Sequence, residues 1–358
     1  MKQIGITTII GDNYGSVLQN YALQTAIRQC GAEPHLISVR PRSYLLKIYR
    51  DYFKPEANRT QCAKFHKLQS DIRNHVKRNK VKSFYKDNVI IRNYKNLAEV
   101  SQREKDTDAF ICGSDQIWNP AFQPNSLYYL SFSEDKPKYS YAASIAVDTI
   151  SERAKSYYSS ALSSYSGVSV REETGYHLLP GLVRDEILRV DCDPVLLLQK
   201  DDWMRLVSDR YKGKRFVFFY MLRPSEDLLE YAIKFAHEKN LELVFIGDYY
   251  FGSRNLQQTT DAGVEDFLSA IYYADYVITN SFHCTVFSTI FEKLFLSQVI
   301  SRTGSRVSDY LNALGLRNHV IANSEEISLE AIDYTTVRKK LNDLGLKSRM
   351  YLESIINN

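Results

Sequence analysis

The sequence predicts an α/β protein of two domains, each built on a parallel β-sheet. Segments with strand and helix patterns alternate along most of the chain. Its 358 residues exceed what a single hydrophobic core usually serves. Hydrophobic residues make up 44% of the chain and charged residues 25%. Those ordinary values exclude a disordered or fibrous protein.

The first expected unit is a strand, a loop and a helix. Residues 3–10 have a β-strand pattern, residues 11–15 form a glycine-bounded loop, and apolar residues recur at helical spacing over 17–27. A second strand is expected at 35–39. The loop would then lie at the carboxyl end of the first strand, where open α/β sheets usually bind ligands.

Residues 40–95 interrupt this alternation and form a basic segment. They hold 16 Lys and Arg against 4 Asp and Glu, a net charge of +12, whereas the whole chain carries +4. We expect two amphipathic helices here, around 44–53 and 63–85, in which cations are interleaved with apolar and aromatic residues.

The alternation then resumes. In the first half we expect strands at 109–112, 138–145, 168–171 and within 187–197, and a helix at 151–163. The second half predicts strands at 215–221, 241–246, 276–279 and 295–301, and helices at 226–239, 264–274 and 283–294. The polar stretch 199–214 favours a boundary between domains 1–198 and 199–358. Residues 329–356 add one or two helices able to fold back on the first domain.

Several classes of function lack their motifs. The chain has no P-loop, dinucleotide fingerprint, zinc-protease or esterase motif, and its seven histidines show no metal-ligand spacing, so we expect no metal. Five scattered cysteines suit a reducing compartment. The start resembles a strand rather than a signal peptide, and no apolar run approaches the roughly 20 residues of a membrane span. We therefore expect a cytoplasmic protein.

Two candidate motifs lie in the first domain. The loop with Asn13 and Tyr14 opens a helix, which suits an anion or a sugar hydroxyl, although a plain β–α turn explains it equally well. Residues 112–120 place Asp115 and Trp118 directly after an apolar strand, where they can bind a sugar through hydrogen bonds and stacking. The alternative is that Asp115 caps a helix and Trp118 fills the core.

Three more motifs carry cations or a histidine. Arg171 and Glu172 follow a buried strand, where an arginine needs an anion or an internal acid. His283 begins a helix just after Asn280 and Ser281, a setting that suits acid–base work, although a lone histidine is often structural. Arg306 supplies another cation beside a helix start, or is an ordinary surface residue.

Taken together, the motifs resemble the polysaccharide pyruvyl transferase family, in family order from about residue 4 to residue 320. The matching stretches are Asn13-Tyr14-Gly15, Gly113-Ser114-Asp115-Gln116-Ile117-Trp118-Asn119-Pro120, Tyr141-Ala142-Ala143-Ser144, Ser169-Val170-Arg171-Glu172, Asp193-Pro194, Asn280-Ser281-Phe282-His283, and Arg306 with Leu314-Gly315-Leu316. Cys284 stands where the family usually has glycine.

The resemblance implies two Rossmann-like domains facing a cleft, similar to the GT-B glycosyltransferase fold. It implies phosphoenolpyruvate as co-substrate, with no other cofactor, and a sugar of a surface polysaccharide, such as exopolysaccharide or capsule, as acceptor. The pyruvyl group becomes a ketal and phosphate leaves. The acceptor would face the first domain and the donor the second.

The resemblance also suggests roles for the candidate residues. Arg171, Asn280, Ser281, His283 and Arg306 would bind the donor; His283, Arg171 and Glu172 would be catalytic; Asn13, Tyr14, Asp115 and Trp118 would bind the acceptor. Glu172 suits a structural partner of Arg171 equally well.

The basic segment suits the cytoplasmic membrane face, where a lipid-linked acceptor would be found, or it is a solvated helical insertion. We expect no nucleic-acid partner, because no binding module accompanies these cations. Two other functions stay open: a GT-B-like glycosyltransferase that uses a nucleotide sugar, and a catalytically silent carbohydrate-binding protein.

Overall fold

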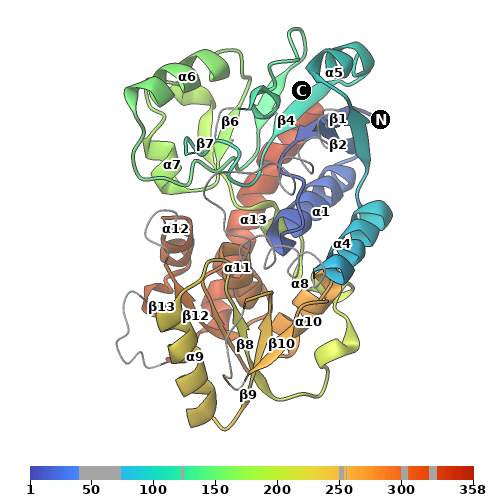
Figure 1. Ribbon diagram of the computed structural model, residues 1–358. Helices are drawn as coiled ribbons and strands as arrows, with labels where there is room; N and C mark the ends of the chain where they lie inside the picture. Colours follow the sequence, from blue (N-terminus) through green and yellow to red (C-terminus); the bar gives the residue numbers. More distant parts are fainter. Residues whose placement is uncertain (40–73, 122–124, 250–253, 255, 300–304, 322–328) are drawn as a thin grey trace, which may run out of the picture.

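Two parallel β-sheets organise the chain (Figure 1). The computed structural model describes residues 1–39, 74–121, 125–249, 254, 256–299, 305–321 and 329–358. The first sheet has the order β3-β2-β1-β4-β5 and the second β10-β9-β8-β11-β12-β13, and every adjacent pair is parallel. In both sheets the strand order reverses beside the first strand, as in doubly wound folds.

The strands of the first sheet are β1 (Gln3–Thr7), β2 (Glu33–Val39), β3 (Ile91–Tyr94), β4 (Ala109–Cys112) and β5 (Lys138–Ser140). A two-stranded sheet, β6 (Val168–Val170) with β7 (Leu188–Val190), continues it through bridges such as Tyr139 to Gly167. The second sheet holds β8 (Phe216–Tyr220), β9 (Glu242–Ile246), β10 (Gln257–Thr259), β11 (Tyr276–Thr279), β12 (Leu294–Gln298) and β13 (Val320–Ile321).

The helices that accompany the first sheet are α1 (Tyr14–Gln29), α4 (His75–Asn88), α5 (Leu97–Arg103), α6 (Glu152–Leu162) and α7 (Glu173–His177). Beyond them come α8 (Lys200–Met204), α9 (Glu226–Glu238), α10 (Val264–Tyr273), α11 (Phe282–Ile290), α12 (Ser305–Leu314) and α13 (Tyr334–Asn357). Short 3-10 turns include η1 (Ser126–Tyr129), η2 (Asp185–Ile187), η3 (Pro194–Leu197), η4 (Asp209–Tyr211) and η5 (Arg317–His319).

One hydrophobic cluster extends across both sheets. Val17 and Leu18 of α1 belong to the same cluster as Phe218 of β8 and Leu268 of α10, and all four side chains are buried. Because α1 is buried on nearly every side, it acts as a central element between the sheets rather than as a surface helix.

Helix α13 also contacts both sheets (Figure 1). Near its start, the hydroxyl of Tyr334 donates to the carbonyl of Lys293, just before β12. Near its end, the Tyr351 hydroxyl donates to the carbonyl of Ser140 at 3.1 Å, and the Lys2 ammonium donates to the carbonyl of Ile356 at 3.0 Å. The two chain ends therefore lie close together. The predicted one or two terminal helices are a single helix.

The basic segment departs from its expected form. The helix expected at 44–53 lies outside the described residues. Residues 63–73 of the helix expected at 63–85 also lie outside them, and its remainder is helical within α4. Residues 91–94 form β3, which pairs with β2, so the segment also supplies a strand of the first sheet. Strand β3 was not predicted, because Arg92 and Asn93 are polar and exposed at this sheet edge.

Candidate active site

The candidate residues gather where loops from the carboxyl ends of β1, β4, β6 and β11 meet. In each sheet this is the point at which the strand order reverses. The link between the sheets is direct: the ring of His283, in the first turn of α11, lies against Gly15, in the first turn of α1. The site therefore combines side chains from both halves of the molecule.

Gly15 has a steric reason to be glycine. A Cβ atom at residue 15 would stand 2.1 Å from Nδ1 of His283, far inside any allowed contact. Asn13 fixes the start of α1, since its side-chain oxygen accepts the Gly15 N–H at 2.9 Å. The Asn13-Tyr14-Gly15 motif therefore sets where the histidine ring can lie.

Arg171 is held by a carboxylate from the segment that follows β7. Its Nη1 atom donates to Oδ2 of Asp193 at 2.6 Å, and both side chains are buried. Burial opposes charge on both groups, but the ion pair raises the pKa of Arg171, and His283 with Arg171 holds the pKa of Asp193 well below its usual range. Nε and Nη2 of Arg171 have no hydrogen-bond partner within the described residues.

His283 approaches the same carboxylate from the opposite half of the molecule. Its Nε2 lies 3.3 Å from Oδ2 of Asp193, although this nitrogen makes no hydrogen bond of good geometry within the described part of the chain. Asp193 itself is fixed as the N-cap of η3, where Oδ1 accepts the Val195 N–H at 3.1 Å. Asp193 thus joins Arg171 and His283, two of the three residues predicted to be catalytic.

Arg306 of α12 supplies a second buried guanidinium. Its Cζ atom lies over the Phe282 ring, 5.7 Å from the ring centroid, and the Cζ atom of Arg171 lies over the same ring, 4.6 Å from the centroid. Burial and the nearby charge of Arg171 lower the pKa of Arg306 to about 10. With its amide oxygen turned toward Arg306, Gln116 accepts from Nη1 at 3.0 Å.

Some of these side chains line a cavity of about 100 Å³, although His283 and Gln116 are not among its lining residues. Its wall includes Arg171, Glu172, Asp193, Phe282 and Arg306. Two guanidinium groups so close together repel each other, and buried donors without partners cost free energy. Both features are relieved by an anion, so the arrangement can bind a small anionic ligand.

Glu172 has a clear structural task. Its Oε1 accepts from the Ser144 hydroxyl at 3.0 Å and from the N–H groups of Ile145 and Ala146 at 2.8 Å each. Its Oε2 has no hydrogen-bond partner within the described residues and lies 3.9 Å from Nε of Arg171. The geometry favours a residue that fixes the 144–146 loop, and a catalytic role for Glu172 stays a prediction.

Asn280 and Ser281 also have structural tasks. The Asn280 oxygen accepts from the N–H groups of Leu222 and Arg223, and its amide nitrogen donates to the Arg223 carbonyl at 2.8 Å. Ser281 caps α11, since its hydroxyl accepts the Cys284 N–H at 3.4 Å. Both residues thereby shape the turn that presents His283, and their predicted contact with the donor is not tested by this geometry.

The predicted acceptor residues separate into two kinds. Trp118 is 1% exposed, donates through Nε1 to the Tyr128 carbonyl at 3.1 Å and stacks with Tyr129, so its ring fills the core. Tyr14 is also 1% exposed; it stacks on Phe267, and its hydroxyl donates to the Ala262 carbonyl at 2.7 Å. Packing explains both rings, and the predicted contact of Trp118 and Tyr14 with the acceptor is not tested by this geometry.

Asn13 and Asp115 remain accessible. Asn13 is exposed and Asp115 is partly exposed. Asp115 has a φ of 70°, and its Oδ1 accepts the N–H of Gln116 at 2.8 Å, so the carboxylate bends back over its own loop. Its charge also acts on both Arg171 and Arg306. Of the four predicted acceptor residues, these two keep polar atoms available to a ligand.

Sequence reasoning missed three residues of the cluster. Asp193, Phe282 and Gln116 belong to motifs noted in the sequence, but no role was predicted for them. Asp193 carried a signal, since an aspartate before proline is typical of a turn or helix start. Nothing in the sequence showed that this turn lies against Arg171 and His283, because those contacts span 22 and 90 residues.

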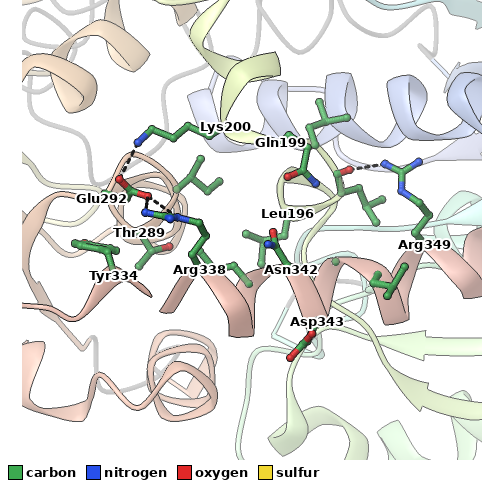
Figure 2. A pocket seen from close by; sticks show the side chains of 16 residues that line it. Leu196, Gln199, Lys200, Thr289, Glu292, Tyr334, Arg338, Asn342, Asp343 and Arg349 are labelled. Atoms are coloured by element: carbon green, nitrogen blue, oxygen red, sulfur yellow. Dashed lines mark hydrogen bonds and ion pairs between the residues drawn. The ribbon is translucent and has the colours of Figure 1, made fainter. Parts of the chain in front are cut away.

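A larger cavity, of about 470 Å³, lies beside α13 (Figure 2). None of the residues predicted to form the site lines it. Several of its charged side chains serve one another or the backbone: Lys200 and Arg338 both pair with Glu292, and Arg349 donates to the Leu197 carbonyl. Asn342 and Asp343 in its wall are exposed. The smaller cavity is the candidate because predicted residues line it and two buried Arg171 nitrogens there have no hydrogen-bond partner within the described residues.

The described residues contain neither a metal-binding cluster nor a membrane-spanning helix. No group of three or more His, Cys, Asp or Glu side chains there is arranged to hold a metal ion. Among the same residues, no helix combines the length and apolar character that a membrane crossing requires.

Comparison with known proteins gives one family match and several structural likenesses. The family model described as polysaccharide pyruvyl transferase matches residues 13–297. No protein with a curated description matches the chain.

The likenesses among solved structures are to nucleotide-sugar enzymes. UDP-GlcNAc 2-epimerase from Neisseria meningitidis, bound to UDP-GlcNAc, superimposes with a TM-score of 0.57 at 10% identity, over 100% of both chains. S. aureus MnaA, in a structure with UDP, gives 0.53 at 15% identity, over 99% of this chain and 90% of that one. A putative UDP-N-acetylglucosamine 2-epimerase from Listeria monocytogenes gives 0.54 at 12% identity, over 99% and 91%. At such identities they show the fold, and they confirm the predicted GT-B-like arrangement.

Proposed function

Because this chain belongs to the polysaccharide pyruvyl transferase family, we propose that it moves the pyruvyl group of phosphoenolpyruvate onto a sugar. The acceptor is a surface polysaccharide unit or its lipid-linked precursor, the product is a ketal, and phosphate leaves. The observation that carries the proposal is the buried cluster of Arg171, Arg306 and His283. Two nitrogens of Arg171 in this cluster have no hydrogen-bond partner within the described residues.

The cluster suits the charges of this donor. Phosphoenolpyruvate carries a carboxylate and a phosphate, and the planar guanidinium group matches both in bidentate geometry. Arg171 and Arg306 lie over one aromatic ring, so a single ligand with two anionic groups can meet both. We assign the donor to this cavity, with Asn280 and Ser281 shaping the turn beside it.

The reaction needs one proton delivered and two removed. Protonation of the methylene carbon makes the neighbouring carbon electrophilic, and a sugar hydroxyl attacks it and loses its proton. The bond to the phosphate oxygen then breaks, a second hydroxyl closes the ketal, and its proton leaves with phosphate. His283 is the side chain placed for proton transfer, a role typically worth roughly 10²–10⁴-fold in rate.

The acceptor would approach from the first half of the molecule. Asn13 and Asp115 are the accessible polar groups beside the cluster there, and the Asp115 carboxylate suits sugar hydroxyls. We therefore propose these two residues for acceptor contact, whereas Trp118 and Tyr14 support the site from the core.

A membrane contact of residues 40–95 stays part of the proposal, with the protein at the inner face of the membrane. In the described part of this segment, Lys80 pairs with Asp266 at 2.9 Å and Lys77 lies over the Tyr14 ring, so both serve packing. Lys82 and Lys86 are exposed. Co-sedimentation with vesicles of anionic lipid tests the contact, and loss of binding on reversal of these two charges is the supporting result.

Ligand-induced stabilisation tests the donor site. We expect phosphoenolpyruvate at 100 times its Kd to raise the free energy of unfolding by about 2.7 kcal/mol, and so to raise the melting temperature. UDP-GlcNAc should leave the melting temperature unchanged. Arg171→Gln should abolish the shift. The matched control is Arg205→Gln, whose side chain is 78% exposed, and it should keep the shift.

The opposite pattern would favour the glycosyltransferase alternative. A shift with the nucleotide sugar and none with phosphoenolpyruvate would contradict the proposed donor. Equal shifts in Arg171→Gln and wild type would contradict the proposed place of binding.

A further inference from the structure

We infer that Asp193 is a positioning residue that fixes the tautomer of His283, with the proton on Nε2 and the lone pair on Nδ1. The catalytic meaning of this arrangement rests on the proposed function, whereas the tautomer itself is a property of the folded chain. Nothing in the family match assigns a role to Asp193.

The Nε2 nitrogen of His283 faces a carboxylate. This nitrogen is buried, has no other hydrogen-bond partner within the described residues, and lies 3.3 Å from Oδ2 of Asp193. A carboxylate is an acceptor only, so the nitrogen that faces it must carry the proton. Catalytic hydrogen bonds are often poorly aligned before substrate binds. Here Nε2 and Oδ2 are already within hydrogen-bond distance, and the contact lacks only alignment.

Hydrogen bonds hold the Asp193 carboxylate in one orientation. Its Oδ1 accepts the Val195 N–H at 3.1 Å, and its Oδ2 accepts from Arg171 at 2.6 Å. The carboxylate is completely enclosed. Oδ2 is thus fixed between the arginine and the histidine.

Nδ1 lies beside a positive helix end. This nitrogen is on the side of Gly15, in the first turn of α1, where the helix dipole is positive. A positive helix end disfavours a proton on a nearby nitrogen and favours a lone pair. Both ends of the ring therefore favour the same tautomer.

The ring belongs to a network of charged groups centred on Asp193. The Asp193 carboxylate lies against both His283 and Arg171, and Glu172 lies 3.9 Å from the same arginine. The charges of Asp115, Glu172 and Asp193 also act on Arg171 and Arg306. Since Nε2 is enclosed, Nδ1 is the nitrogen left to exchange a proton with substrate.

In the proposed reaction, Nδ1 takes the proton of the attacking sugar hydroxyl as the new carbon–oxygen bond forms. The ring then carries protons on both nitrogens, and Asp193 stabilises this cation at Nε2. The Nδ1 proton afterwards passes to solvent, which replaces the proton that solvent delivered to the methylene carbon. Without the carboxylate the neutral ring could present either nitrogen, and the cation would lose its partner.

The direct test is nitrogen NMR of ¹⁵N-histidine-labelled protein, recorded over a pH series that extends until the ring signals stop changing. His283→Asn identifies the His283 signals by their loss. In wild type we expect Nε2 to be protonated and Nδ1 unprotonated. A proton on Nδ1, or an even mixture of tautomers, would overturn the inference without any use of activity.

Asp193→Asn is the informative variant. An amide has one acceptor where the carboxylate has two, so it cannot serve Val195, Arg171 and His283 together, and we expect the tautomer preference to be lost. The matched control is Asp191→Asn, which removes a buried carboxylate paired with Arg189 instead. That control should keep the wild-type tautomer.

Kinetics supply the second readout. We expect Asp193→Asn to lower kcat by about 10²-fold or more, and to raise KM for phosphoenolpyruvate through its effect on Arg171. An unchanged kcat and tautomer in a folded variant would refute the role of Asp193 and leave the proposed function standing. Failure of wild type to release phosphate would refute the proposed function, while the NMR result would still decide the tautomer.

Discussion

At the scale of single residues, Gly15 and His283 depend on each other. They are 268 residues apart in sequence, yet a single added carbon at residue 15 would collide with the imidazole ring. The glycine is therefore needed for a close approach to a side chain, rather than for an unusual backbone angle.

We predict that Gly15→Ala lowers the rate of phosphate release by about 10²-fold, because displacement of a catalytic group by about 1 Å costs that much. Gly11→Ala is the control, since a Cβ atom there would meet only Ile9, at 3.9 Å. Steady-state kinetics of both variants check the prediction. A wild-type rate in Gly15→Ala would show that the position of the ring does not limit the reaction.

Cys284, at the position where the family usually has glycine, lies in the core. Its side chain is completely buried, and this burial raises the pKa of its thiol to about 12. The thiol is therefore neutral near physiological pH and takes no part in the proposed chemistry. It packs behind the helix start that presents His283.

At the scale of elements, Glu104 joins β2, β3 and the end of α5. It accepts from Nε2 of His35 at 2.8 Å, from Arg92 at 3.2 Å, and from the hydroxyls of Tyr94 and Thr107. Burial alone would raise the pKa of Glu104, but these donors lower it to about 2. The ionised carboxylate thus holds the edge of the first sheet together.

This pKa predicts a specific dependence of stability on pH. Glu104 titrates near 4.3 when unfolded, so its contribution, on the order of 3 kcal/mol, is complete above about pH 5. It is lost as the pH falls from there toward 2. Urea unfolding across this range should show the loss. Glu104→Gln should be less stable at neutral pH and show a flatter slope.

Glu152→Gln is the control for the removal of a charge, because that side chain is 86% exposed. It should leave both the stability and the slope unchanged. An equal slope in Glu104→Gln and wild type would contradict the assigned pKa.

Elements were predicted well from the sequence where a short apolar run stands between polar residues. The strands at Ala109–Cys112 and Tyr276–Thr279 have the expected bounds, because each is a short apolar run between polar residues. Strand β3 and the two-residue β13 were predicted poorly, since edge strands with little burial carry no such pattern.

The candidate site was predictable in its cations but not in its support. Arg171 and His283 were predictable because charged or titratable groups rarely follow buried strands without a reason. Arg306 was noted as a cation beside a helix start. The burial of Trp118 and Tyr14 depended on partners far along the chain, such as Phe267 for Tyr14. Local sequence cannot show whether an aromatic ring meets a core or a ligand.

At the scale of the whole molecule, the two sheets place the carboxyl ends of their central strands together. The first turns of α1 and α11 face each other, each at the reversal point of its own sheet. Contacts away from the site hold this arrangement: α13 joins both sheets, and Lys80 of α4 pairs with Asp266 of α10. An active site shared between two halves is consistent with a reaction that joins two different substrates.

The measurement that tests this account most directly is release of phosphate from phosphoenolpyruvate across a panel of glycosides, with mass analysis of each acceptor. We predict phosphate release and the gain of one pyruvyl group with at least one glycoside, in excess EDTA as well as without it. Arg171→Gln and His283→Asn should lose both signals, while Arg205→Gln and His237→Asn, changed at exposed positions, should keep them. Wild-type release by either site variant in folded form, or no release with any acceptor, would contradict the account.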